Sequence, residues 1–396
     1  THVEAQLRDW LGTLYFFSGE HDAATQQFRD ALRLAKLVGD SHTLGSASFH
    51  LAQALHMQGE ITETIPLLEH AHQHFTQADD ARGLIGTMNM LGQLFRQRGD
   101  IDEARRWYQG GIELGRARHD YYGLLVILNN MGVLLHELGD FAGSLALFDE
   151  SEELLQKLGT AQDGLVMLNF GRNYEALGDI DKAAAFYEGA IPVFEAQHAR
   201  HHALVARSWA SRAARLRGDL TQAQQWIDEA LRGFRQNNTL FSIADSLANL
   251  GDIGLARAEL DGAEKAYDES LQLVRQLGQP GGELRCAAAL ARIATMRGDS
   301  TKAQEWLETA VSILPKTHQL IIQYQLLASL AMFFAANGNA AHGMALLNWI
   351  QQQPTAMWET RQFAQNEAAA LHDQVENVAT ISPDRSLTEL LTFNFS

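Results

Sequence analysis

The sequence predicts an all-α fold: a right-handed α-solenoid superhelix of about nine antiparallel helix pairs, closed by a C-terminal capping helix. Three observations support this fold class. A turn that contains glycine recurs about every 40 residues along the chain. Between these turns, apolar residues recur with the 3.6-residue period of a helix. The 396 residues include only six prolines, and no run of alternating apolar residues indicates a strand.

The turn glycine sets the period of the repeat. Its positions lie 40 residues apart with one step of 39, and alanine occupies the seventh of them. Glycine ends a helix readily because it adopts a positive φ without steric cost. The aspartate that often follows it can accept hydrogen bonds from the first amides of the next helix. The turn positions are Gly19, Gly59, Gly99, Gly139, Gly178, Gly218, Ala258, Gly298 and Gly338.

Small residues and one large residue complete each unit. In the third unit these are Gly92 in the first helix, Ala104 in the second helix and Tyr108 four residues later. Small residues let two helix axes approach closely, and a large side chain one turn further on fills the wedge between successive pairs. The first-helix glycine is replaced at Ala52, Ser211, Ala291 and Ala331, and the second-helix alanine is replaced at Thr64 and Gly343 among others.

The helices of the fourth unit show the apolar periodicity. In both of them the apolar residues recur three, four and seven positions apart, which places them on one face of a helix. The residues concerned are Leu124, Ile127, Leu128, Met131 and Leu134 in the first helix, and Leu145, Phe148, Leu154 and Leu155 in the second.

The whole pattern, L-G-x6-G-D-x3-A-x3-[FY]-x2-A, resembles the tetratricopeptide repeat in its long, 40-residue variety. The resemblance extends over nine units, roughly residues 3–355, and is specific because the pattern is repeated. It implies a superhelix of helix pairs whose concave groove binds a ligand. We therefore predict a repeat array over residues 1–355, with no domain boundary inside it.

Residues 356–396 form a second predicted region, a capping helix and tail. Pro354 stops the ninth unit, and residues 357–378 have the pattern of a longer, more polar helix. A solenoid needs such a helix to cover its last apolar surface. Ser382, Pro383 and Asp384 predict a turn, and residues 386–391 form a short apolar segment after it.

The tail carries a second resemblance. The runs Q-Q-P-T-A-M-W-E-T-R-Q-F-A and R-S-L-T-E-L-L resemble the extreme C-terminus of bacterial signal-transduction ATPase (STAND-type) regulators. In that family a nucleotide-binding module precedes a long repeat array that acts as sensor and scaffold. The resemblance implies that an N-terminal effector domain of the same polypeptide precedes Thr1, and the absence of an initial Met is consistent with a piece cut from a longer protein.

Composition excludes several other functions. The net charge of -17 argues against a nucleic-acid-binding surface, because contacts to phosphates need clustered Lys and Arg. No apolar run is long enough to cross a membrane, and no signal peptide precedes the first repeat. The single cysteine, Cys286, excludes an internal disulfide and suits a reducing cytoplasm. We therefore predict a cytoplasmic protein without membrane or nucleic-acid partners.

Nothing in the sequence indicates catalysis, a cofactor or a metal. The phosphate-binding, dinucleotide-binding and hydrolase motifs are absent, and the repeated glycines are structural because they follow the period. His70 and His74 are spaced to share a metal ion, but no third ligand is evident. We interpret them as solvated surface histidines.

The concave groove is the predicted binding surface. The resemblance places certain first-helix positions in that groove. Asn and Gln suit a peptide backbone because each offers a donor and an acceptor, and Arg can hold a carboxylate or phosphate in a fork. Six arginines against Glu175, Asp245 and Asp252 favour a ligand with an anionic end. The predicted ligand-binding residues are Gln53, His56, Asn89, Gln93, Arg96, Asn129, His136, Arg172, Arg212, Arg215, Arg285 and Arg292.

Three functional hypotheses remain open from the sequence. The first is a non-catalytic sensor and scaffold arm of a larger bacterial regulator, either transcriptional or defensive, that binds a peptide, a protein or a small anionic ligand. The second is a free-standing adaptor that bridges two partners. The third is a peptide-pheromone receptor domain, whose arrays have a similar period.

Overall fold

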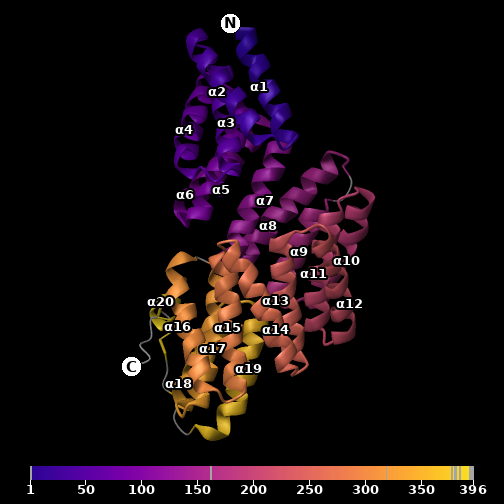
Figure 1. Cartoon of the computed structure of the whole chain (residues 1–396), viewed down its shortest axis with the longest axis vertical. Helices are drawn as coiled ribbons and strands as arrows, with labels where there is room; N and C mark the ends of the chain where they lie inside the picture. Colours follow the sequence, from indigo (N-terminus) through magenta and orange to yellow (C-terminus); the bar gives the residue numbers. More distant parts are fainter. Residues whose placement is uncertain are drawn as a thin grey trace. The chain divides into compact units, whose positions relative to one another are not determined.

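The computed structural model describes residues 2–160, 163–317, 319–375, 378, 381–382 and 385–391 (Figure 1). The described residues form twenty α-helices and two short 3-10 helices, and none of them forms a strand. The predicted all-α fold of repeated helix pairs is therefore confirmed. No helix among these residues is both long and apolar enough to cross a membrane.

The helices cluster into two compact units. The first comprises Thr1–Leu134 and Asp149–Leu154, and the second comprises Leu135–Phe148 and Leu155–Ser396. Helices α1 to α6 belong to the first unit, whereas α7 and α8 contribute residues to both. The bounds are α1 His2–Phe17, α2 His21–Val38, α3 Ser41–Met57, α4 Ile61–Gln77, α5 Ala81–Arg98, α6 Ile101–Arg118, α7 Tyr121–Glu137 and α8 Phe141–Lys157.

The second unit continues the same alternation. Each odd-numbered helix packs against the even-numbered helix that follows it, from α9 with α10 to α17 with α18. The bounds are α9 Gly164–Leu177, α10 Ile180–Ala196, α11 Arg200–Leu216, α12 Leu220–Gln236, α13 Leu240–Ala256, α14 Leu260–Gln276, α15 Pro280–Met296, α16 Ser300–Ile313, η1 Leu314–Lys316, α17 Leu320–Ala336, α18 Ala340–Gln351, α19 Trp358–Leu371, η2 His372–Gln374 and α20 Leu387–Leu391.

The turn position of the repeat adopts the left-handed conformation that glycine favours. Gly99 has a φ of 83° and Gly178 a φ of 95°, and Ala258, in the same place in its own unit, is held at 59°. The aspartate after the glycine begins the next helix as predicted. The side chain of Asp219, for example, accepts a hydrogen bond from the amide of Gln222 at 3.0 Å.

The aromatic residue of a unit packs directly on the first-helix glycine of that unit. A Cβ atom added to Gly171 would lie 2.4 Å from the Tyr187 ring, and one added to Gly92 would lie 2.5 Å from the Tyr108 ring. Both tyrosine side chains are buried. The glycine is therefore needed because the ring occupies the space of its missing side chain.

The C-terminal helix is shorter than predicted. It spans Trp358–Leu371 and is followed by a 3-10 turn to Gln374, and Val378 is not helical. The prediction of a helix over residues 357–378 is therefore wrong beyond Gln374. Val375 and Val378 continue the apolar spacing of the buried face, but neither joins the core on which Ala364, Ala368 and Leu371 pack, and Val378 is 37% exposed. Pro383 and Asp384 of the predicted turn lie outside the described residues, and Ser386 precedes the short helix α20.

Helix α19 covers the last helix pair and also reaches back to the turns of earlier repeats. It packs on α17 and α18 and contacts α9. Just before it, Thr355 lies against Gly139, and its first residue, Trp358, lies against Gly178. Met357 packs with Phe141 and Ala176. The C-terminal segment therefore packs on both ends of the second unit's repeats.

Candidate ligand-binding cavity

The second unit contains a cavity of about 730 Å³. Its wall is formed by the end of α7, by the first helices of the following repeats (α9, α11, α13, α15 and α17), and by α19. First helices line the wall because their second-helix partners pack on the opposite side. The helical period then decides which side chains face inward, such as Arg212 and Arg215, one turn apart on α11.

Half of the predicted site residues lie in this wall. They come from four different helices, α7, α9, α11 and α15, and are His136, Arg172, Arg212, Arg215, Arg285 and Arg292.

The other predicted residues lie on α3, α5 and α7 in the first unit, outside this cavity. All are partly buried, and Asn89 accepts a hydrogen bond from the Asn130 side chain at 2.7 Å. A role in ligand binding remains a prediction for this set, which consists of Gln53, His56, Asn89, Gln93, Arg96 and Asn129.

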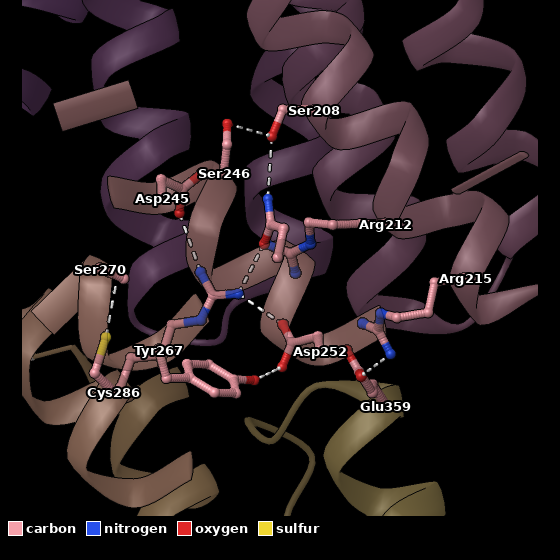
Figure 2. A network of polar contacts seen from close by, with 12 residues as sticks. Ser208, Arg212, Arg215, Asp245, Ser246, Asp252, Tyr267, Ser270, Cys286 and Glu359 are labelled. Carbon is pink, nitrogen blue, oxygen red and sulfur yellow. Dashed lines mark hydrogen bonds and ion pairs between the residues drawn. The ribbon is translucent and has the colours of Figure 1, made fainter. Parts of the chain in front are cut away.

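Arg285 is the centre of a polar network in the wall, and its partners Asp245 and Asp252 are labelled in Figure 2. Its Nη1 atom donates to Asp245 Oδ1 at 3.0 Å, and its Nη2 atom donates to Asp252 Oδ2 at 2.7 Å. Nη2 also donates to Asn249 Oδ1 at 2.7 Å, and the Tyr267 hydroxyl donates to the other oxygen of Asp252. The fork of the guanidinium thus joins α13 to α15.

The charges of this network reinforce one another. Burial alone would raise the pKa of Asp252, but the positive charges of Arg285 and Arg215 lower it overall. Burial would lower the pKa of Arg285, but Asp252 and Asp245 raise it overall. Both groups therefore stay ionised at any working pH, and the pair acts as a fixed charged contact between α13 and α15.

A second network joins α9 to α11. Arg212 Nη2 donates to Glu175 Oε1 at 2.6 Å, and the Tyr187 hydroxyl donates to Glu175 Oε2 at 3.0 Å. The Glu175 side chain is only 2% exposed. Both carboxylate oxygens are therefore occupied by partners from the fold itself.

Helix α19 contributes a third charged contact. Arg215 Nη1 lies 2.8 Å from Glu359 Oε1, which joins α11 to the first turn of α19 (Figure 2). Burial acts to raise the pKa of Glu359, but Arg215 lowers it overall. The pair therefore fixes the start of α19 against the wall.

Two arginines of the wall have aromatic neighbours instead of carboxylates. The guanidinium of Arg172 lies 5.3 Å from the centre of the Trp209 ring, and that of Arg292 lies 5.2 Å from the centre of the Phe363 ring. Within the described chain, neither has a carboxylate at ion-pair distance. Burial lowers the pKa of Arg172 below the usual arginine value, since its charge is incompletely compensated.

His136 lies near Arg172 in the cavity wall and is uncharged. Burial and then the charge of Arg172 lower the pKa of His136 to about 3. Its Nδ1 atom is 3.2 Å from Asn173 Oδ1, which requires the proton to be on Nδ1. His136 therefore leaves Nε2 as an acceptor and adds no positive charge at neutral pH.

The excess of positive charge expected from the sequence is absent from this wall. Among the described residues that line it, five arginines face six carboxylates, because Glu137, Glu359 and Glu367 join the three acidic residues considered before. An anionic ligand is therefore not favoured by net charge. Besides the paired charges, the wall offers two arginines without an ion pair, Arg172 and Arg292, and apolar side chains such as Met332 and Ala289.

Several residues of the cavity wall were not predicted from the sequence. Tyr187 and Tyr267 occupy the aromatic position of the repeat, yet their hydroxyls reach the polar groups of the groove. The choice of Tyr over Phe there was a usable signal, because a buried hydroxyl needs a partner. Glu359 and Phe363 lie on α19, whose path gave no sequence signal.

Family models match most of the chain. The model described as the MalT-like TPR region matches residues 149–373, which is more than half of the chain. Two tetratricopeptide repeat models match residues 43–117 and 124–157. A search of curated proteins found no match.

Solved structures share the fold at low sequence identity. A Rap protein complexed with competence and sporulation factor is 12% identical with a TM-score of 0.62, over 94% of this chain and 99% of that one. NprR in complex with its cognate peptide NprX is 13% identical with a TM-score of 0.55, over 93% and 90%. A signal transduction ATPase with numerous domains and a tetratricopeptide repeat sensor, from Pyrococcus horikoshii, is 17% identical with a TM-score of 0.54, over 78% and 47%.

These likenesses agree with the repeat seen in the sequence and with the helix pairs of the structure. The matches to the Rap and NprR structures extend over nearly the whole length of this chain, and the chain spans about half of the signal transduction ATPase. The match over residues 149–373 shows that the chain belongs to the tetratricopeptide repeat proteins of the MalT-like family.

Proposed function

We propose that this chain is the ligand-sensing arm of a multidomain regulator and that it binds a short peptide in the cavity of its second unit. The observation that carries the proposal is the wall itself. A cavity of about 730 Å³ falls within the range of about 300–1,000 Å³ that is typical of ligand pockets. Its two arginines without an ion pair, Arg172 and Arg292, and its apolar side chains suit a chain molecule with a charged end.

The wall has groups for each part of a peptide. Arg172 has no carboxylate at ion-pair distance, although the charge of Glu137 acts on it, so it can receive a carboxylate without first losing an ion pair. Glu367 supplies negative charge near Arg292. Gln325, which is partly buried, offers both a donor and an acceptor to a peptide backbone. Met332 and the alanines of α13 and α15 provide apolar contact. One structural neighbour, NprR, was solved in complex with its cognate peptide NprX, which supports this ligand class.

A route from binding to signalling follows from α19. This helix forms part of the wall and is also joined to α11 through Arg215 and Glu359. A ligand that changes the spacing of the first helices would therefore change how α19 is seated. Because each repeat contacts mainly its neighbours, small rotations add up along a solenoid. An effector domain attached to the array could respond to that change.

The test is a thermal unfolding assay with a pool of short peptides of mixed sequence. A peptide that binds the folded chain stabilises it by RT ln(1 + [L]/Kd), so the unfolding midpoint rises with the logarithm of the peptide concentration above Kd. Ala289→Trp places a large side chain in the cavity and should abolish the shift, whereas Ala117→Trp, exposed on α6, should leave it unchanged. A shift that survives Ala289→Trp would contradict the proposed site.

A free-standing adaptor is the second candidate, because the first unit also presents half-buried amides on first helices, including Gln53, Gln93 and Asn89. An adaptor would bind one partner through each unit. Binding of a peptide that is equally sensitive to Gln93→Ala and to Ala289→Trp would favour it.

A further inference from the structure

Two charged groups in the cavity wall of the second unit lack a close partner of opposite charge. Arg172, on α9, forms no ion pair and no side-chain hydrogen bond within the part of the chain that the structure describes, and its guanidinium faces the Trp209 ring. Glu367, on α19, has no cation at ion-pair distance among the described residues. Both side chains are partly buried. The wall therefore holds one cation and one anion that the fold itself leaves unpaired.

The repeat register explains why Arg172 is unpaired. One position of the first helices carries a charged residue in four successive repeats, as Arg172, Arg212, Asp252 and Arg292. Arg212 pairs at 2.6 Å with Glu175, which lies 37 residues earlier on the preceding first helix. The position equivalent to Glu175 in the repeat before Arg172 is His136, which is uncharged. The array thus supplies a carboxylate to Arg212 but none to Arg172.

Glu367 reaches the wall on the face of α19 that lies along it. Glu359, Phe363 and Glu367 are four residues apart, so they share one side of the helix. Glu359 meets Arg215 of α11, and Phe363 meets Arg292 of α15. The charge of Arg292 also acts on Glu367, but from beyond ion-pair distance. Glu367 therefore lines the cavity without a cation in contact.

Burial acts on both groups in the direction expected for charges without close partners. It lowers the pKa of Arg172, although Glu137 and Glu175 act against it. It raises the pKa of Glu367, although Arg292 acts against it. In each case the charged form is disfavoured. A ligand group of opposite charge supplies the missing compensation at either place, and no existing ion pair has to break.

We propose that the cavity takes a short peptide with both ends free, its terminal carboxylate held by Arg172 and its terminal ammonium group by Glu367. This inference rests on the proposed function and adds the end groups and the direction of the peptide. Trp358 packs on Gly178, the turn that ends α9, and Glu367 lies about 13 Å further along α19 at 1.5 Å per residue. An extended peptide covers such a length in about four residues at about 3.3 Å each. The two ends of a short peptide therefore match the two unpaired groups.

Thermal unfolding of the whole chain with four peptide pools tests the end groups. The pools share random sequences of roughly four to six residues without charged side chains, and they have free ends, an amidated C-terminus, an acetylated N-terminus, or both blocks. The free pool should raise the unfolding midpoint, and either block should weaken binding at least tenfold, since each removes a charge-assisted contact. Equal shifts from all four pools would overturn this inference and leave the proposed function standing. No shift from any pool would count against the proposed function itself.

The source of the two charges is tested with a fifth pool. It has both ends blocked and carries one Asp and one Lys side chain in each peptide. It should shift the midpoint less than the free pool does. A larger shift than that of the free pool would show that side chains, and not the ends of the peptide, supply the charges, and it would overturn the assignment.

Two variants test the direction of the peptide. In Arg172→Met, amidation should no longer change the shift, whereas acetylation still should. Glu367→Gln should show the reverse pattern. A merely structural role would alter the shifts of all pools together, so the selective loss identifies the contact. Arg232→Met on α12 and Glu305→Gln on α16 are exposed controls outside the wall and should keep both effects. The opposite pairing of variants and blocks, or no selectivity in either variant, would overturn the assignment.

Discussion

Arginine side chains have opposite roles in the middle of the cavity wall and at its two ends. In the middle, Arg285 is held by two carboxylates and an amide. At the ends, Arg172 and Arg292 lie over aromatic rings. An arginine whose donors are already occupied joins helices, whereas one that faces an aromatic ring can still receive a ligand. The contrast separates residues that hold the wall together from residues that can bind.

The largest expected effect is in the middle of the wall. Arg285→Met leaves Asp252 and Asp245 without their partner in a buried place, and breaking a buried pair typically costs about 3–5 kcal/mol of unfolding free energy. Urea unfolding measures it. Arg235→Met is the control, because its pair with Glu269, at 2.9 Å, is about half exposed and should cost less than about 1 kcal/mol. Equal costs would remove the distinction between the middle of the wall and an ordinary surface pair.

The pH dependence of stability sharpens the comparison at the Arg172 end. The pKa of His136 is about 3 in the folded chain, against 6.5 for an ordinary histidine. The unfolded chain therefore binds the proton more readily, so stability is lost as the pH falls from about 6.5 towards 3.

His136→Gln should remove the part of the acid-induced loss of unfolding free energy that comes from His136. That part amounts to a few kcal/mol, since a shift of one pKa unit corresponds to about 1.4 kcal/mol. Unfolding free energies of both proteins, measured from pH 7 to pH 4, give the comparison as a difference in slope. A vertical offset in addition to the difference in slope is compatible with this prediction, because the substitution also changes the contact with Asn173. Parallel curves over the whole range would show that His136 is not held uncharged.

The seating of α19 is tested at the turn it covers. Gly178→Ala combines a positive φ of 95° with a Cβ atom that would lie 2.5 Å from the Trp358 ring. Gly218→Ala is matched in conformation, with a φ of 84°, but has nothing within 4 Å. Both should cost about 1 kcal/mol for the backbone, and Gly178→Ala should cost about 1–2 kcal/mol more for the displaced ring. Equal losses would mean that Trp358 does not pack on this turn.

The smallest effect on stability is expected at the ends of the wall. Arg172→Met removes a buried charge that has no carboxylate partner, so unfolding free energy should change by less than about 1 kcal/mol, or increase. Peptide affinity should fall at least tenfold in a calorimetric titration, since a charge-assisted contact is lost. A large loss of stability with unchanged affinity would place Arg172 among the residues that hold the wall.

The repeat architecture could be predicted from the sequence because its signals are local and recur. The turn glycine, the first-helix glycine and the aromatic residue each lie within a few residues of the contact they make, as with Gly171 and Tyr187. The period then places Arg212 and Arg285 on the same helix face without further information. Half of the predicted groove residues, all from the second unit, were found in the cavity wall in this way.

The path of α19 and its contacts with the cavity wall could not be predicted, because they depend on contacts between residues far apart in the sequence. The direction of α19 after Pro354 is decided by packing against Gly139 and Gly178, which lie far earlier in the chain. The sequence therefore did not reveal that Glu359 would meet Arg215, or that Phe363 would meet Arg292. The prediction of an excess of positive charge was wrong for this cavity for the same reason, because α19 brings Glu359 and Glu367 into its wall.

Hydrogen exchange with and without a binding peptide tests the central claim most directly. The claim is that the cavity of the second unit is the ligand site. It predicts slower exchange in α9, α11, α13, α15 and α19 when the peptide is bound, with α1 to α6 unchanged. Protection confined to α1 to α6, or no protection at a saturating concentration of the peptide, would contradict it.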